Sequence, residues 1–168
     1  KAAFDRWLVV EPMRRWRDRM CREAHLFVTT SASILPPWIP ADRVLEVEWG
    51  ADVAHFRPDA PPSATFPVLD PARIWCVFAG AFRSWHGAVH LSAALARLHA
   101  KGDNRFGGLF IGDGPERAAV EHAARGVPAV VFTGAVPYAQ LPGALAAADI
   151  GVAPFDASRH APLTLGFY

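Results

Sequence analysis

The sequence predicts an α/β fold in which helices flank a parallel β-sheet. From residue 74 onward, short apolar runs alternate with segments of helical spacing, a pattern typical of parallel strands joined by right-handed crossover helices. The stretch 109–116 (Leu-Phe-Ile-Gly-Asp-Gly-Pro-Glu) reads as a strand, a turn bounded by glycines and a helix with proline at its first position. Turns at 80–87 and 132–137 punctuate the chain in a similar way. We therefore expect a parallel sheet in the second part of the chain.

The first fifty residues are predicted to hold one helix and two strands. Helical spacing covers 12–24, where one stripe is apolar and consists of Met13, Trp16, Met20 and Ala24. The run 25–29 reads as a strand, and the alternation at 44–48 predicts a strand with one wet face. Prolines between them leave room for at most a short helix in 30–40.

A proline-rich stretch separates this part from the rest. Five prolines occur from Trp49 to Pro71, together with turn residues, so we predict a linker there. After the linker, the predicted strands are 74–79, 106–111, 129–132 and 150–153. The predicted helices are 87–100, 115–124 and 138–147.

Composition excludes several classes of protein. Of the 168 residues, 52% are hydrophobic and 20% charged, a balance typical of globular proteins. A net charge of +1 gives no reason to expect nucleic acid as a partner. The two cysteines form neither a disulfide framework nor a metal-ligand pattern. Because Cys76 lies in an apolar run, we expect a reduced core thiol and a cytoplasmic protein.

The ends of the chain suggest a fragment, because it starts at Lys1 and stops at Tyr168 without a closing helix. No apolar run reaches the ~20 residues of a membrane-spanning helix. Arginines on the helix predicted at 12–24 have two interpretations, a solvated surface or a weak peripheral contact with the inner face of the membrane. These arginines are Arg14, Arg15, Arg17, Arg19 and Arg22.

Four turns are predicted to lie together at one edge of the sheet. Each follows a strand, at 80–87, 112–115, 133–137 and from Pro154 onward. In open α/β sheets, ligands bind beyond the carboxyl ends of the strands, and glycines there let a ligand approach the backbone. We therefore predict a ligand-binding site at this edge.

The motifs that carry these turns follow one another in a recognisable order. They are Trp49–Pro58, the strand and loop at 74–87, Gly112–Glu116, Phe132–Pro137 and Ala146–Asp149. Their order and spacing resemble the C-terminal donor-binding domain of family-4 glycosyltransferases, enzymes of the group 1 type with the GT-B fold. The resemblance extends over nearly the whole chain and implies two Rossmann-like halves. It makes 1–49 a remnant of the N-terminal, acceptor-side domain, 50–70 the interdomain linker and 71–168 the truncated donor domain.

The resemblance also implies a reaction. Such enzymes transfer a sugar from a nucleoside-diphosphate sugar with retention of configuration and need no obligatory metal or cofactor; the acceptor here is an unidentified glycan, lipid or small molecule. The leaving diphosphate must be neutralised as its charge grows. In the family, an Arg and a Lys in the first loop do much of this. Here those positions hold Ala81 and His86, while Arg83 lies in the same loop.

Eight residues are therefore predicted to bind the substrate: Gly80, Arg83, His86, Gly87, Gly112, Gly114, Val136 and Pro137. Arg83 and His86 would contact phosphate, and the glycines would make turns and admit the substrate. Val136 and Pro137 match the segment whose backbone reads the nucleotide base in the family. Tyr168 stands near the first glutamate of the family's Glu-x7-Glu pair, and the second would lie beyond the chain. We therefore expect this piece to be inactive alone.

Other interpretations stay open. Arg83 as a solvated charge, His86 as a structural histidine and Asp149 as a structural residue are the simpler alternatives. Among functions, a related GT-B epimerase or phosphorylase is one alternative. A non-catalytic nucleotide-sugar-binding domain is another, and the replacements at Ala81 and His86 favour it. A nicotinamide-binding domain is weaker, because Arg117 occupies the place of the third glycine of its fingerprint.

Overall fold

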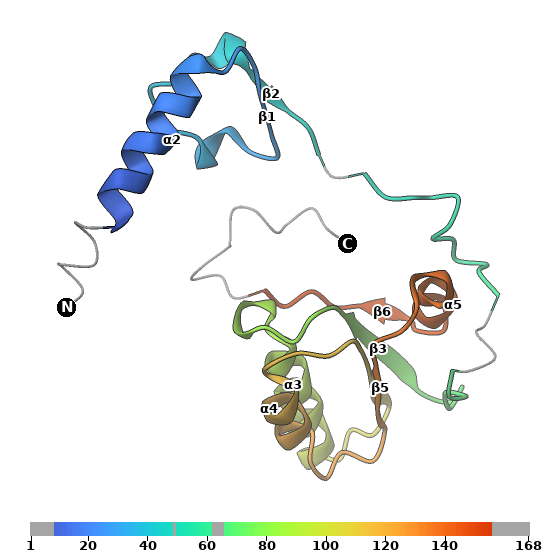
Figure 1. The fold of residues 1–168 in the computed structure, drawn as a ribbon. Coiled ribbons are helices and arrows are strands. Elements are labelled where there is room, and N and C mark those ends of the chain that lie inside the picture. The colour runs from blue at the N-terminus through green and yellow to red at the C-terminus, as the bar shows by residue number, and fades with distance from the viewer. Residues whose placement is uncertain (1–8, 49, 62–65, 156–168) are drawn as a thin grey trace. The chain divides into compact units, whose positions relative to one another are not determined.

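The computed structural model describes residues 9–48, 50–61 and 66–155. The chain divides into two compact units, Lys1–Trp49 and Gly50–Tyr168, and each is described by itself. Both contain parallel strands, and the second adds the flanking helices of a Rossmann-like sheet (Figure 1). The predicted α/β fold class is confirmed.

The first unit contains helix α2 (Glu11–Glu23) and a parallel pair of strands, β1 (Phe27–Thr29) and β2 (Val44–Glu46). Two short 3-10 turns, Ala32–Ile34 and Ala41–Arg43, lie in the connection between the strands. The predicted helix and both strands are confirmed within two residues at each end.

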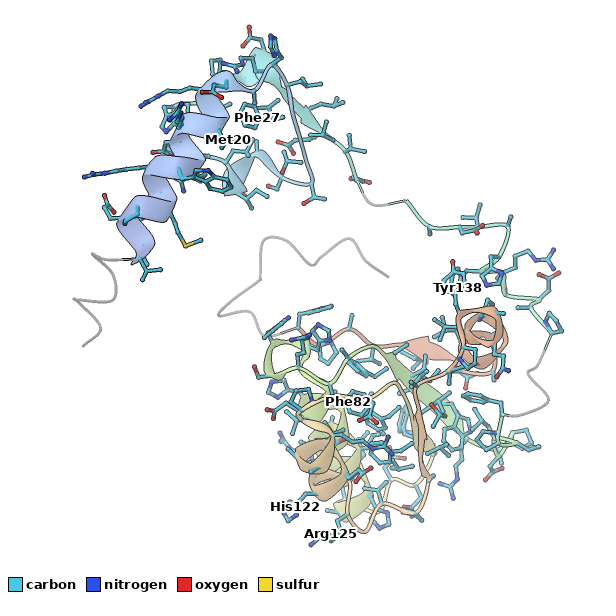
Figure 2. All side chains as sticks on the ribbon, in the orientation of Figure 1. Met20, Phe27, Phe82, His122, Arg125 and Tyr138 are labelled. Atoms are coloured by element: carbon cyan, nitrogen blue, oxygen red, sulfur yellow. The ribbon has the colours of Figure 1, made fainter. Side chains whose placement is uncertain are left out.

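Helix α2 buries none of its residues within this unit. Its apolar stripe is exposed instead: Met13 is 62% exposed, Trp16 66% and Met20 51%. Figure 2 labels Met20 on this helix. Among the described residues, no helix is long and apolar enough to cross a membrane. The weak membrane contact considered for this helix stays a prediction.

The second unit is built on a four-stranded parallel sheet with strand order β5-β4-β3-β6. The strands are β3 (Ile74–Ala79), β4 (Phe106–Ile111), β5 (Val130–Gly134) and β6 (Ile150–Gly151). The helices are α3 (Ala88–Ala100), α4 (Arg117–Ala123) and α5 (Leu141–Ala146), the last preceded by the 3-10 turn η5 (Tyr138–Gln140). The predicted strands are confirmed within two residues, while the helix predicted at 138–147 is divided between η5 and α5.

Two apolar cores lie on opposite faces of this sheet, because successive strand residues point to opposite sides. Phe78 and Phe110 pack toward α3 and α4 together with Leu91. Val77 and Leu109 pack on the other face, in a cluster that includes Ala144 of α5. Figure 1 shows α3 and α4 side by side and α5 across the sheet from them. Burying each of these phenylalanines stabilises the fold by about 1.5–3 kcal/mol.

One predicted helix start is wrong. The pattern placed Pro115 at the first position of a helix, but α4 begins at Arg117. The backbone N–H of Glu116 donates to the carbonyl of Phe82 (2.8 Å), and that of Arg117 donates to Gly114 (3.1 Å). Pro115 therefore lies in a turn that is tied to the loop after β3.

Strand order fixes where a site is expected. From β3 the chain moves outward through β4 to β5, and then returns through α5 so that β6 lies on the other side of β3. The order thus reverses between β3 and β6. In open α/β sheets, the crevice at such a reversal, beyond the carboxyl ends of the strands, is where ligands bind.

Candidate functional site

Main-chain hydrogen bonds join the loops at the carboxyl edge. The N–H of Gly80 donates to the carbonyl of Ile111 (2.9 Å), and the N–H of Phe82 donates to Asp113 (3.0 Å). The N–H of Gly112 donates to the carbonyl of Gly134 (2.7 Å), which extends the connection to the loop after β5. Phe82, labelled in Figure 2, is fully buried and anchors the first loop to the core. The edge is therefore one continuous main-chain structure.

The glycines of the second turn permit this close approach. A Cβ at Gly112 would lie 2.1 Å from the carbonyl oxygen of Gly80, and Gly112 has a φ of +118°. A Cβ at Gly114 would lie 2.6 Å from the backbone nitrogen of Phe82. The space that a side chain would need at both positions is thus occupied by the preceding loop. Their role toward a substrate stays a prediction.

Residues from two segments, the loop after β3 and the residues that follow β6, meet at the reversal between β3 and β6. The turn η4 (Ser84–His86) brings His86 to the start of α3, where its ring packs edge-on against Phe155 with centroids 5.4 Å apart. Nδ1 of His86 lies 3.6 Å from the place of a Cβ on Gly80. Gly87 adopts a φ of +68°, and a Cβ there would lie 1.9 Å from the carbonyl oxygen of Pro154. The predicted residues Gly80, His86 and Gly87 are therefore brought together.

Arg83 lies in the same loop on its solvent side. Its side chain is exposed, and its guanidinium carbon lies 5.4 Å from the centroid of the Trp85 ring. No carboxylate among the described residues forms an ion pair with it. The guanidinium therefore lies over the aromatic face while the side chain stays exposed to water.

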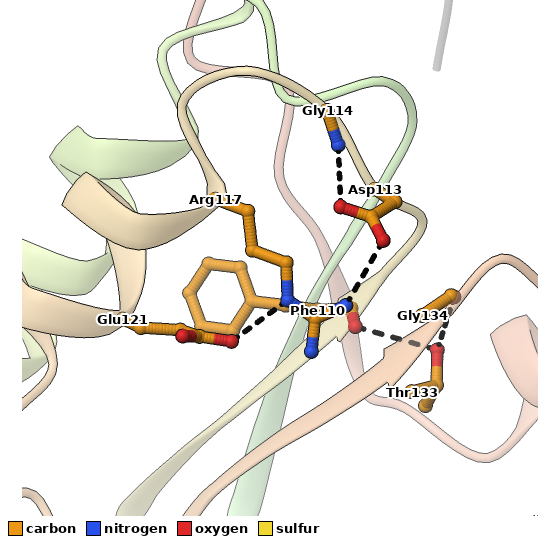
Figure 3. Close-up of polar contacts among 7 residues, drawn as sticks. All are labelled: Phe110, Asp113, Gly114, Arg117, Glu121, Thr133 and Gly134. Carbon is orange, nitrogen blue, oxygen red and sulfur yellow. Dashed lines mark hydrogen bonds and ion pairs between the residues drawn. The ribbon is translucent and has the colours of Figure 1, made fainter.

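A second arginine, Arg117, joins the turn after β4 to helix α4 through its side chain (Figure 3). Its Nε donates to Glu121 (2.7 Å), and a terminal nitrogen lies 3.5 Å from a carboxylate oxygen of Asp113. The other oxygen of Asp113 accepts the N–H of Gly114 (2.7 Å). The hydrogen bond to Glu121, with the nearby charges, raises the pKa of Arg117. Its charge is engaged within the protein, so Arg117 braces the turn.

The predicted base-reading segment follows an irregularity in the sheet. Register between β4 and β5 shifts after Phe110, so that Ile111 pairs with Gly134. The hydroxyl of Thr133 donates to the carbonyl of Gly134 (2.9 Å). Val136 then packs against the α5-side core, whereas Pro137 is exposed. Bulges of this kind redirect the chain at the ends of strands.

Comparison with known protein families identifies the family of this chain. The family described as glycosyl transferases group 1 matches residues 73–166, which include the whole four-stranded sheet and its carboxyl-edge loops. The chain belongs to this family. A search of curated proteins gave no match. The resemblance predicted from the sequence is confirmed at the level of group 1 glycosyltransferases, and the protein is a transferase of glycosyl groups by family.

Two further predictions for this glycosyltransferase concern Asp149 and Tyr168. Asp149 is structural, as its simpler interpretation held, because its carboxylate accepts the N–H of Trp75 (2.8 Å) at the amino edge of the sheet. Tyr168 lies outside the described residues. Sequence reasoning missed the packing of Phe155 on His86 and the brace made by Arg117. The i, i+4 spacing of Asp113, Arg117 and Glu121 was a readable signal for the second.

The arrangement gives the glycosyltransferase an edge suited to anions. The first turn of a helix presents backbone N–H groups without partners inside the helix, and the helix dipole favours negative charge there. Helix α3, with 13 residues, begins directly beside His86 and Gly87 at the strand-order reversal. Among the described residues, no three His, Cys, Asp or Glu side chains cluster in a way that could hold a metal ion.

Proposed function

We propose that this glycosyltransferase binds a nucleoside-diphosphate sugar at the carboxyl edge between β3 and β6. It transfers the sugar with retention of configuration, as family-4 enzymes of the GT-B fold do. One observation carries the proposal: the N-terminus of α3, with His86 and Gly87, lies at the reversal of strand order beside Pro154 and Phe155. A diphosphate is the part of such a donor that this position suits best, because helix N-termini bind phosphate.

Two side chains supply charge and hydrogen bonds to the diphosphate. Arg83 offers a guanidinium that binds phosphate oxygens in a forked geometry. His86 donates a hydrogen bond when neutral and adds positive charge when protonated. Because the leaving group gains negative charge during transfer, groups fixed in place before the reaction lower its barrier.

The nucleoside lies along the next two turns in this proposal. Gly80, Gly87, Gly112 and Gly114 form the close turns that bring the backbone of this edge together beside the donor, and the backbone at Val136 and Pro137 contacts the base. Packing of the Val136 side chain against the core supports this role, since it fixes the position of the segment. No metal or further cofactor takes part.

The acceptor is a glycan, a lipid or a small molecule. A cytoplasmic location, with a weak peripheral contact of the arginine-rich helix α2 at the inner membrane face, belongs to the same proposal. The free cysteines Cys21 and Cys76 support the reducing compartment.

A second candidate is a domain that binds nucleotide sugars without catalysing transfer. Ala81 and His86 favour it, because they replace the arginine and lysine that neutralise the diphosphate in related enzymes. The two candidates predict the same binding and differ in turnover. Release of nucleoside diphosphate from the bound donor in the presence of acceptors supports the transferase, and tight binding without release supports the second candidate.

Calorimetric titration of the protein with uridine, guanosine and adenosine diphosphates and their sugars tests the binding site. We expect Arg83→Ala and His86→Ala each to weaken binding by about 1–3 kcal/mol, the cost of losing a hydrogen bond to a charged group. Arg97→Ala in α3 and His122→Ala in α4 are matched controls, because both side chains are exposed and lie near the far ends of their helices. Unchanged affinity in both site variants would overturn the assignment.

A further inference from the structure

A short segment that precedes the sheet packs onto the turn η5. Asp52 closes a tight turn in this segment: its carbonyl accepts the N–H of Phe56 (2.8 Å), and a carboxylate oxygen accepts the N–H of His55 (3.1 Å). These bonds hold the two aromatic residues at one end of the turn. The segment 50–61 and η5 belong to the same compact unit.

Three aromatic rings make the contact. His55 stacks on Tyr138, with ring centroids 4.8 Å apart and an interplanar angle of 19°. Phe56 packs edge-on against the same ring at 5.5 Å and against His55 at 5.1 Å. Nε2 of His55, when it carries the proton, also donates to the carbonyl of Tyr138 (3.3 Å). Side chain and main chain of Tyr138 are therefore both engaged.

The contact continues onto helix α5. Phe56, Arg57 and Pro58 line one side of a hollow of about 360 Å³, and Pro142 and Leu145 belong to its other side. Residues 55–58 therefore lie along both Tyr138, the first residue of η5, and helix α5. The rings of His55 and Phe56 nevertheless leave Tyr138 61% exposed. This aromatic clamp, formed by His55 and Phe56 on Tyr138, therefore lies at the surface.

We propose that His55 and Phe56 are positioning residues for the nucleotide base, acting through Tyr138. The inference rests on the proposed function, in which the backbone at Val136 and Pro137 contacts the base. Tyr138 directly follows these two residues, so fixing its ring and its carbonyl fixes the outgoing end of the segment. Val136 is held from the other side by the core.

The degree to which residues 136–138 are ordered sets how tightly the base binds. If the segment adopts its binding conformation only part of the time, the measured dissociation constant rises in inverse proportion to that fraction. An aromatic pair of this geometry contributes enough to change such a population about 2- to 10-fold. The phosphates lie at the start of α3 in the proposed site, so the clamp should leave their binding unchanged.

The test separates the base from the phosphates. Affinities for inorganic pyrophosphate and for the best-binding of the uridine, guanosine and adenosine diphosphates are measured for the protein, His55→Ala and His55→Phe. We expect His55→Ala to lose about 2- to 10-fold in affinity for the nucleoside diphosphate and none for pyrophosphate. His55→Phe keeps a ring on Tyr138 and should restore most of the affinity. His122→Ala is the matched control, because its imidazole is exposed and belongs to the last turn of α4.

A second variant tests the same ring contact without depending on whether the His55→Ala protein folds. Tyr138→Ala removes the exposed partner ring, and combining it with His55→Ala should cause no further loss, because both act through one contact. Equal losses for pyrophosphate and nucleoside diphosphate, or no loss for either, overturn the positioning role while the proposed function stands. Failure of the unaltered protein to bind any nucleoside diphosphate overturns both.

Discussion

Replacing Gly112 with alanine tests whether the carboxyl edge depends on the direct contact between its loops. The new Cβ would lie 2.1 Å from the carbonyl oxygen of Gly80, whereas an ordinary contact needs at least 3.4 Å. The two strand ends must therefore separate by about 1.3 Å. Such a shift breaks the two bonds that join these loops, from Gly80 to Ile111 (2.9 Å) and from Phe82 to Asp113 (3.0 Å).

The loss of stability comes from the broken hydrogen bonds and from the backbone strain of an alanine at position 112. Each lost backbone hydrogen bond removes about 0.5–1.5 kcal/mol, and a φ of +118° costs an alanine about 1–3 kcal/mol. We expect the free energy of unfolding to fall by about 2–6 kcal/mol. Urea denaturation followed by tryptophan fluorescence measures it, since Trp75 is only 5% exposed.

Gly126→Ala is the matched control for this prediction. Gly126 also has a positive φ, +86°, but no heavy atom lies within 4 Å of the place that a Cβ would take, so only the backbone term of about 1–2 kcal/mol applies. If Gly112→Ala destabilises the protein no more than Gly126→Ala does, the loops are not held by the contact described, and the reasoning is wrong.

Two further predictions concern Asp149 and Cys76. Asp149→Ala should lower the free energy of unfolding by about 1–3 kcal/mol, because the N–H of Trp75 loses its acceptor, while nucleoside-diphosphate binding in calorimetry stays unchanged; weaker binding at unchanged stability would contradict this. Burial, with a smaller effect from the charge of Asp149, raises the pKa of Cys76 above 9.0. Because the folded state holds this proton more tightly than the unfolded state, the resulting stability is present below pH 9 and is lost as the pH rises through the raised pKa. Iodoacetamide at pH 8 should therefore modify the less buried Cys21 and reach Cys76 only in urea, and equal rates in mass spectrometry would refute this.

The sequence predicts most of the second unit because its elements carry strong local signals. β3 and β4 are uninterrupted apolar runs, as strands buried on both faces require, and both are found at their predicted bounds. The start of α4 was missed for a different reason. The bond from Glu116 to Phe82 joins residues far apart in the chain, so no local pattern contains it.

Prediction of the candidate site is limited in the same way. The spacing of the glycines predicts where the turns are. It does not predict which residues lie beside these turns, because that depends on strand order and on contacts between loops. That His86 packs on Phe155 depends on β6 returning to the side of β3, and this placement has no signature in the residues between. The exposed apolar stripe of α2 shows the same limit, since spacing predicts a stripe but not its partner.

Hydrogen bonds between the loops of the carboxyl edge have a consequence for how this protein can change. Peptide groups do not titrate, so the shape of the edge and the partial charges it presents are constant across the pH range in which side chains gain or lose protons. Redesign of the proposed diphosphate contacts can then proceed by exchanging the few residues that project from this scaffold, such as Arg83 and His86. The glycines beneath them form the part of the protein that such redesign must leave alone.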